Sequence, residues 1–327
     1  MRVAPELAKL GHVALVTPDI ERSFSFFHDV LGLEESGRRG DTIFLRAWGD
    51  FEHHSLSLSP GPEAYVEHIA WRARRAEDVE GFRGRLREAG LSVQSLEAGA
   101  EEAQGPAIRF DVPGGQTFEI YYEMQKALAP PEQRSRLRNQ VSRSSSRGIS
   151  PRRIDHVNVR VPNPAALHEW LVDNLGFKVR ERIRLNNGTV PAAWLSVTPF
   201  VHDIAVNIEK SGRLGRFHHL AFWMDERQDI LRAADILREN DVKIDAGPGK
   251  HGISQAFYLY FRDPGSGLRI ELFSGGYLIL EPDWAPIEWP EDSLEEGLTW
   301  WGQTTLVEAM QTTTGRSLGR AKADAGE

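Results

Sequence analysis

Hydrophobic and polar residues follow the same order twice along this chain. Residues 10–16 alternate in the way typical of a β-strand, and residues 18–32 carry apolar side chains at helical spacing and then a glycine. The same strand, helix and glycine return at residues 154–159 and 164–176. Each half continues with three strands, a second amphipathic helix and two closing strands. The second helices are expected at residues 77–89 and 228–240.

This repeat predicts an α+β chain of two tandem domains. Each half contains two βαβββ units, and two such units curl into an eight-stranded cup that can hold a metal. We expect the N-terminal domain at residues 1–132 and the C-terminal domain at residues 154–302. Residues 133–153 are rich in Arg and Ser and poor in apolar residues, which indicates an interdomain linker. Residues 303–327 show no periodicity where the chain ends, so we expect a disordered tail.

Composition narrows the class of protein and its partners. A chain of 327 residues that is 40% hydrophobic can bury two substantial cores. The formal charge of −8 argues against a nucleic-acid partner, whose phosphates favour a basic surface. We find no apolar run long enough to span a bilayer and no signal-peptide core, so we expect a cytoplasmic protein without a membrane partner. The absence of cysteine excludes disulfides and thiolate ligands.

Two histidines and one glutamate lie on three separate strand-like runs of the second half. They are His156, His219 and Glu271. Two imidazoles and one carboxylate on one face of an octahedral metal leave the opposite face open. A bidentate diol and a molecule of O₂ can then bind together. The sequence therefore predicts the kind of metal site that a ring-cleaving dioxygenase needs.

The paired βαβββ modules, with these three residues on the first, fifth and last strands of the second half, resemble the type I extradiol catechol dioxygenases of the vicinal oxygen chelate superfamily. The resemblance covers about residues 8–302 and is most specific over residues 247–260, continuing to Glu271. It implies ring opening beside the diol of a small aromatic substrate, with Fe(II), or alternatively Mn(II), as metal and O₂ as co-substrate. It also implies that the second histidine of His218-His219 is the ligand, and His218 should point away because strand neighbours alternate.

The resemblance assigns further roles around the metal. His202 matches the histidine that takes a proton from the diol and returns one, which an imidazole can do near neutral pH. Tyr260 and His251 match the residues that hydrogen-bond the diol oxygens. Asn158 faces the same way as the first ligand by strand periodicity, and Trp194 is expected to form a wall of the pocket.

The first half repeats much of this set without its supporting residues. Its equivalents of the three ligands are His12, His68 and Glu119, and His53 takes the position of His202. No residue corresponds to His251, and two positions differ, with Arg109 in place of Tyr260 and Ala14 in place of Asn158. A guanidinium in the cup would repel a divalent ion. The resemblance implies that this half is a scaffold without metal.

Two positions bear on the substrate. Relatives that cleave carboxylate-bearing catechols have arginines where this chain has Ala246 and Leu298. This difference favours neutral diols, so the expected activity is that of a catechol 2,3-dioxygenase acting on catechol or alkylcatechols. The alternatives are a 2,3-dihydroxybiphenyl 1,2-dioxygenase or a homoprotocatechuate 2,3-dioxygenase. A glyoxalase-type isomerase or transferase and a metal-free binding protein are alternatives of another class. We expect a homo-oligomer, either a tetramer or a dimer.

Overall fold

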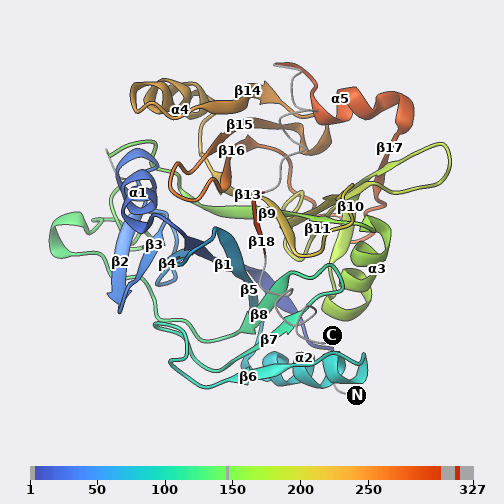
Figure 1. Ribbon diagram of the computed structural model, residues 1–327, viewed down its shortest axis with the longest axis horizontal. Coiled ribbons are helices and arrows are strands. Elements are labelled where there is room, and N and C mark those ends of the chain that lie inside the picture. The colour runs from blue at the N-terminus through green and yellow to red at the C-terminus, as the bar shows by residue number, and fades with distance from the viewer. Residues whose placement is uncertain (1–3, 145–146, 303–313, 317–327) are drawn as a thin grey trace.

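The computed structural model describes residues 4–144, 147–302 and 314–316 and shows two β-sheets, one in each half (Figure 1). The elements of the first half are β1 (Leu7–Thr17), α1 (Ile20–Ser25), β2 (Glu34–Arg39), β3 (Thr42–Arg46), β4 (Leu56–Pro60), β5 (Tyr65–Ala73), α2 (Ala76–Glu88), β6 (Gln94–Leu96), β7 (Ala107–Asp111) and β8 (Thr117–Tyr121). A π-helical turn, Phe26–Val30, extends α1, and a short 3₁₀ turn, Pro131–Gln133, follows the sheet.

The second half repeats this series and then adds to it. Its elements are β9 (Arg153–Val161), α3 (Pro164–Leu175), β10 (Lys178–Arg184), β11 (Ala192–Ser196), β12 (Ile204–Ile208), β13 (Arg216–Trp223), α4 (Arg227–Glu239), β14 (Ile244–Lys250), β15 (Ala256–Arg262), β16 (Arg269–Gly275), β17 (Ile287–Pro290), α5 (Leu294–Leu298) and β18 (Thr314–Arg316). Short 3₁₀ turns cover Ile253–Gln255 and Glu291–Ser293.

The two sheets have the same strand order, which confirms the predicted internal repeat. The first runs β2-β3-β4-β1-β5-β8-β7-β6, and the second contains β10-β11-β12-β9-β13-β16-β15-β14. The second sheet is larger than the expected eight strands, because β17 pairs with β10 and β18 pairs with β13. Both extra strands are short and follow the repeated unit, so no counterpart in the first half indicated them.

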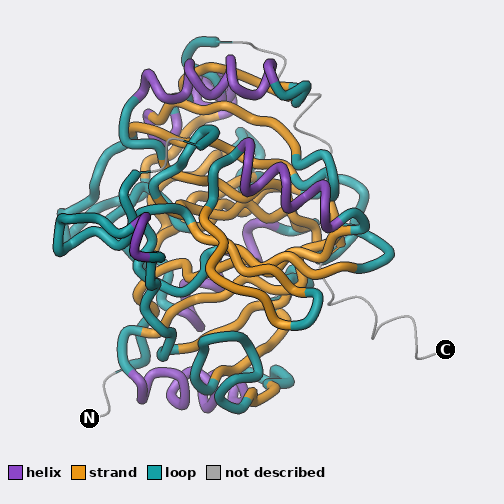
Figure 2. The backbone as a smooth tube through the Cα atoms, turned by 90° about the vertical axis from the view of Figure 1, so that its left-hand side faces the viewer, coloured by secondary structure: helices purple, strands orange, loops and turns teal. Residues whose placement is uncertain are grey.

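The helices agree with the sequence pattern and lie outside the sheets. Helix α3 buries Leu167, Leu171 and Leu175, and it ends at Gly176, whose φ of 76° is left-handed and favours glycine. Helices α2 and α4 lie at opposite ends of the molecule with the strands gathered between them (Figures 1 and 2). No helix among the described residues is long and apolar enough to cross a membrane.

In each half, the turn between the last two strands of the repeated unit contacts the other half. After the β7–β8 turn, Gln116 donates from Nε2 to the carbonyl oxygens of Arg160 at 3.2 Å and Arg216 at 3.0 Å. In the β15–β16 turn, Asp263 accepts a hydrogen bond of 2.6 Å from the hydroxyl of Ser23 in α1. The exchange is reciprocal, so each sheet closes against part of its duplicate.

The segment between the halves packs against the first domain. Arg46 donates to the Ser142 hydroxyl at 2.6 Å, and Arg147 donates to the carbonyl oxygens of His28 and Leu33 at 2.7 and 2.8 Å. Most of the tail that was expected to be disordered, 303–313 and 317–327, lies outside the described residues. The three residues between those ranges form β18, which pairs with β13.

One continuous hydrophobic core extends through both halves. Trp71 on β5 and Phe177, which follows α3, are both buried, and their rings meet edge to face with centroids 4.9 Å apart. Phe26 and Phe261 form a second aromatic contact between the halves at 6.0 Å. Such pairs add about 0.5–1.5 kcal/mol to the burial of their surfaces. The position of the second sheet therefore depends on side chains from the first.

We expect Phe177→Ala to lower the free energy of unfolding by about 3–5 kcal/mol, because the change opens a cavity against Trp71. Urea unfolding followed by tryptophan fluorescence and circular dichroism measures this loss. Phe51→Ala is the matched control, since Phe51 is 56% exposed and its truncation should change stability by less than about 0.5 kcal/mol. Equal effects of the two changes would contradict a core shared by the halves.

Candidate metal centre

Three neighbouring strands of the second sheet bring the predicted ligands together. His156 lies on β9, His219 on β13 and Glu271 on β16, and these strands are adjacent in the order β16-β13-β9. Each of the three side chains is at most 4% exposed. Residues far apart in the sequence therefore meet on one face of the central strands.

The three donor atoms form a nearly equilateral triangle. His156 Nε2 lies 3.2 Å from His219 Nε2, and each of these nitrogens lies 3.0 Å from Glu271 Oε2. Neighbouring donors around an octahedral ion with bonds of roughly 2.1 Å are separated by about 3.0 Å. The triangle thus fits one face of an octahedral divalent ion, and it confirms that His156, His219 and Glu271 form a metal site.

Outer hydrogen bonds orient both imidazoles toward the ion. Asp155 Oδ2 lies 2.8 Å from His156 Nδ1, and the other oxygen of Asp155 accepts a hydrogen bond of 2.5 Å from Arg153. His219 Nδ1 lies 2.7 Å from Nδ1 of His218. A ligand that donates its second N–H in this way keeps the correct tautomer and orientation.

His218 does not point away from the site as simple alternation predicted. It is buried, contacts His219 and lines the same cavity. The pairing of β13 with β9 shifts between Phe217 and His219, so a β-bulge at His218 breaks the alternation of side chains. The expectation was wrong because a bulge cannot be read from strand periodicity.

Before a metal binds, the three ligands share one proton. Burial lowers the pKa of His219 to about 4, although Glu271 lies beside it. Burial also disfavours a charge on His156, but hydrogen bonds with Asp155 and Glu271 outweigh it and raise the pKa of His156 to about 9. Burial alone would raise the pKa of Glu271, but contacts with the two imidazoles lower it well below its usual range. A divalent ion must displace the proton from His156.

His202 packs directly against the first ligand. Its ring centroid lies 4.1 Å from that of His156, and Phe273 lies 5.6 Å away on another side. Burial, followed by the charge of His156, lowers the pKa of His202 well below its ordinary value. Its Nδ1 is buried without a hydrogen-bond partner among the described residues. His202 is therefore a neutral imidazole at neutral pH, with a nitrogen able to accept a proton.

His251 and Tyr260 form a hydrogen-bonded pair beside Glu271 and His219. His251 Nδ1 donates to the carbonyl oxygen of Leu298 in α5 at 2.5 Å, and His251 Nε2 lies 3.1 Å from the hydroxyl of Tyr260. That Nε2 is also 3.6 Å from Glu271 Oε1. Burial and the charge of Glu271 raise the pKa of Tyr260 well above its usual value, so its hydroxyl keeps its proton.

A cavity of about 420 Å³ opens on the metal ligands. His202, His251 and Tyr260 line it, as do the other two predicted pocket residues, Asn158 and Trp194. Its remaining wall includes six apolar side chains, Ile183, Leu185, Ala192, Ile253, Leu294 and Leu298. The volume lies within the range of small-molecule sites, roughly 300–1,000 Å³. The structure thus brings together every residue that the sequence predicted for this site.

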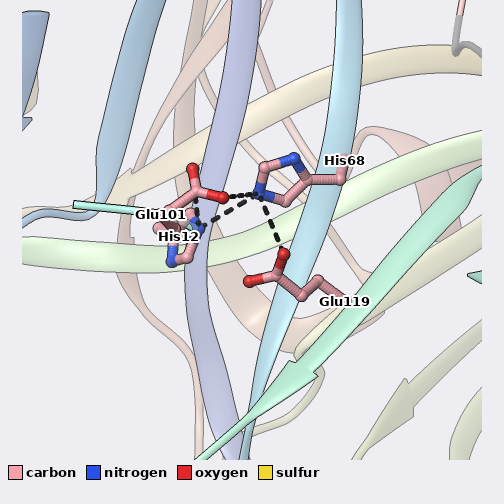
Figure 3. Close-up of side chains that lie close together, drawn as sticks. All are labelled: His12, His68, Glu101 and Glu119. Atoms are coloured by element: carbon pink, nitrogen blue, oxygen red, sulfur yellow. Dashed lines mark hydrogen bonds and ion pairs between the residues drawn. The ribbon is translucent and has the colours of Figure 1, made fainter. Parts of the chain in front are cut away.

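The first half holds a second cluster of the same kind (Figure 3). Strands β1, β5 and β8 place His12, His68 and Glu119 together, as expected. Arg109 pairs with Glu119 in the β7–β8 ladder as Tyr260 pairs with Glu271 in the β15–β16 ladder. Ala14 faces His68 as Asn158 faces His219.

Two residues of this cluster were misplaced or missed. His54, not His53, takes the position of His202, because the His54 ring is completely buried 4.5 Å from that of His12. The segment between β3 and β4 is irregular, so alternation could not distinguish the two histidines. Glu101 joins the cluster from the loop between β6 and β7. Its only sequence signal is that the equivalent loop of the second half carries His251.

Family comparisons agree with this geometry. Residues 153–272 match the Glyoxalase/Bleomycin resistance protein/Dioxygenase superfamily, and residues 66–125 match the catechol 2,3-dioxygenase-like N-terminal domain. The chain is 61% identical to a manganese-dependent 2,3-dihydroxybiphenyl 1,2-dioxygenase of Geobacillus genomosp. 3, over 91% of this chain and 94% of that protein. It is 38% identical to a metapyrocatechase of Geobacillus stearothermophilus, over 91% and 90% of the two chains.

The chain belongs to the extradiol dioxygenases. A solved relative of this extradiol dioxygenase is homoprotocatechuate 2,3-dioxygenase from Brevibacterium fuscum in complex with 3,4-dihydroxyphenylacetate. The TM-score is 0.84 at 32% identity, over 95% of this chain and 93% of that chain. The predicted fold and family are thereby confirmed, and aromatic diols are the substrate class.

We expect the affinity of the metal-free enzyme for Mn²⁺ to rise roughly tenfold per pH unit between about pH 6 and pH 8. Over this range, below the pKa of about 9, His156 holds the proton that the metal must displace. Isothermal titration at several pH values measures the slope. His156→Ala should abolish the high-affinity binding, and binding independent of pH would contradict the proposed proton on His156.

Proposed function

We propose that this enzyme opens the ring of 2,3-dihydroxybiphenyl or a similar aryl-substituted catechol next to the diol, with Mn(II) as its metal and O₂ as co-substrate. The observation that supports this substrate class is the cavity, which has the metal ligands at one part of its lining and six apolar side chains at another. An apolar ring on the substrate would bury its surface against those side chains. A diol placed beside His156, His219 and Glu271 would leave space in the cavity for a second ring.

The apolar wall also supports a neutral diol over a charged one as the proposed substrate. Leu298 lines the cavity where relatives with acidic substrates carry an arginine, whereas Ala246 is fully buried beside Tyr258 and Tyr260. The named activity of the 61% identical relative supports the dihydroxybiphenyl alternative better than the expected catechol activity. Catechol and alkylcatechols lack the second ring that this wall can accommodate.

The metal is proposed as Mn(II) rather than the expected Fe(II). Nitrogen and carboxylate donors bind both ions without sharp discrimination. The dependence named for the 61% identical relative favours manganese, although another relative, from Rhodococcus jostii, is named iron-dependent. Bound to His156, His219 and Glu271, either ion would supply adjacent positions for the diol and O₂ and a path for electrons between them.

The surrounding residues hold the diol and move its protons. In this proposal His202, neutral and in contact with His156, accepts a proton near the O₂ position and returns it as the ring opens. Tyr260 keeps its hydroxyl proton and donates a hydrogen bond to a diol oxygen. The carbonyl oxygen of Leu298 holds the His251 ring, so Nε2 can form a hydrogen bond with a diol oxygen. Asn158 and Trp194 border the ring, and Asn207 orients Asn158 through a hydrogen bond of 2.9 Å.

Substrate competition tests the proposed specificity. We expect kcat/KM for 2,3-dihydroxybiphenyl to exceed that for catechol by at least about tenfold, corresponding to roughly 1.4 kcal/mol from burial of the second ring. Homoprotocatechuate should be the poorest of the three. Leu185→Ala should lower kcat/KM several-fold for the biphenyl diol and leave catechol turnover nearly unchanged, because Leu185 belongs to the apolar wall proposed to contact the second ring.

A preference for catechol or homoprotocatechuate over 2,3-dihydroxybiphenyl would change the proposed substrate. A preference for homoprotocatechuate would indicate that its carboxylate pairs with Arg160 or Lys210, which line the cavity. Oxygen uptake with a yellow ring-opened product separates the dioxygenase from other proteins of the fold. A glyoxalase-type isomerase or transferase, or a metal-free binding protein, would consume no O₂.

The role of His202 is tested by His202→Phe. We expect normal metal content and normal anaerobic diol binding, with turnover slowed by at least about tenfold, since proton transfer by one side chain is worth about 10²–10⁴ in rate. Metal analysis, the absorbance change of the diol under argon and steady-state kinetics measure the three quantities. A well-folded, metal-loaded variant with full turnover would exclude His202 from proton transfer.

His54→Phe is the matched control for this variant. His54 is equally buried and packs against His12 in the same way, but it lies in the other half of the chain. Loss of stability without slower turnover is the expected result for this control. Slower turnover in both variants would attribute the effect of His202→Phe to folding rather than to proton transfer.

A further inference from the structure

The cluster in the first half has four convergent donors rather than three (Figure 3). His68 Nε2 lies 3.2 Å from His12 Nε2, 3.6 Å from Glu101 Oε2 and 4.0 Å from Glu119 Oε2. His12 Nε2 is 4.0 Å from Glu101 Oε1. All four donor atoms lie within 4.8 Å of one another, so small side-chain movements would bring them around a single ion.

Arg109 supplies the positive charge that these groups require. Its Nε donates to Glu119 Oε2 at 2.5 Å, and its Nη2 donates to Glu101 and lies 3.5 Å from His68 Nε2. The guanidinium thus contacts three of the four donors. Glu119 and His68 are completely buried, and only 11% of the Glu101 side chain is exposed. Two carboxylates in this environment are stable only when a cation lies beside them.

Two corresponding segments, a loop and the hairpin that follows it, provide different side chains in the two halves. In the second half, the loop before the last hairpin provides His251 and the hairpin provides Tyr260. In the first half, the corresponding loop provides Glu101, and the ladder position that matches Tyr260 carries Arg109. The second half has His251 and Tyr260, which are proposed to hydrogen-bond the diol. The first half has instead the ion pair of Arg109 and Glu101. The first cup therefore retains ligands for a cation but not the groups that would bind a substrate beside it.

We propose that Arg109 is a built-in substitute for a metal, and that its replacement by an uncharged side chain exposes a structural site for one divalent ion such as Mn²⁺. The ligands of this site are His12, His68, Glu101 and Glu119. With both imidazoles neutral, as metal ligation requires, the two carboxylates, the guanidinium and a divalent ion would sum to +1. Without the guanidinium, the same ion brings the cluster to zero. The arginine thus excludes the metal both by charge and by occupying the space between the carboxylates.

The site created by replacing Arg109 should bind a divalent ion more weakly than the catalytic site does. His156 is oriented by Asp155, but the residue before His12 is Gly11, and His12 Nδ1 has no hydrogen-bond partner among the described residues. A Cβ at Gly11 would lie 2.2 Å from the hydroxyl of Tyr121, so no carboxylate fits at that position. Loss of such an outer partner costs about 10–100-fold in metal affinity.

Metal content of the full-length protein tests the proposal. After growth and dialysis with excess Mn²⁺, we expect one ion per chain in the wild type, two in Arg109→Met and one in Arg109→Met/His12→Gln. Arg109→Lys is the matched control, because it retains the charge and should keep one ion. In Arg109→Met/His156→Ala, whose catalytic site is disabled, Mn²⁺ should raise the melting temperature, and His12→Gln in addition should abolish the rise.

Several results would overturn this assignment. A folded Arg109→Met protein that holds one ion at millimolar Mn²⁺ shows that the four donors do not form a site. Two ions in the wild type show that Arg109 does not exclude the metal. If Arg109→Met and Arg109→Gln are insoluble without metal but fold when Mn²⁺ is supplied, the ion replaces the arginine as proposed. If both remain insoluble with Mn²⁺, a metal cannot substitute for the guanidinium. Each readout is independent of the reaction catalysed by the second half.

Discussion

The function of this protein depends on one constraint, the adjacency of three central strands. Strands β9, β13 and β16 are separated by other strands along the chain. They are nevertheless neighbours in the sheet, because the chain returns to its centre each time. Only this order places His156, His219 and Glu271 within 3.2 Å of one another. The outer strands then complete the site, since β14 and β15 carry the segment with His251 and Tyr260. The topology of the sheet therefore sets the arrangement of the three donor atoms.

The two halves show how one framework can satisfy the same electrostatic demand in different ways. Both bury a carboxylate beside two imidazoles on the middle strands of the sheet. In the second half the triangle of donors is regular and open to a cavity. In the first half Arg109 and Glu101 close the cup with an ion pair, and its strands provide the hydrophobic contact through Trp71. The repeated framework thus contains one cup that is open to a cavity and one that is closed by an ion pair.

Much of this architecture could be predicted from the sequence, because its signals are periodic. The repeat of strand, helix and glycine indicated both domains, and motif register identified His156, His219 and Glu271 on separate strands. The misses occur where the backbone departs from regular geometry. The bulge at His218, the irregular segment at His54 and the loop position of Glu101 leave no periodic pattern. The hydrogen bond between His251 and the carbonyl oxygen of Leu298 could not be predicted either, because every residue has a backbone carbonyl and the residue type does not mark the one that accepts.

The contact between His251 and the carbonyl oxygen of Leu298 separates the shape of the pocket from the orientation of the His251 ring. Leu298 presents its side chain to the cavity, whereas its backbone oxygen holds the His251 ring. Any residue except one that displaces the backbone provides the same oxygen. The pocket can therefore be reshaped at this position for a different diol while the His251 ring remains aligned. A single residue offers evolution a means to change what is recognised without changing how it is cleaved.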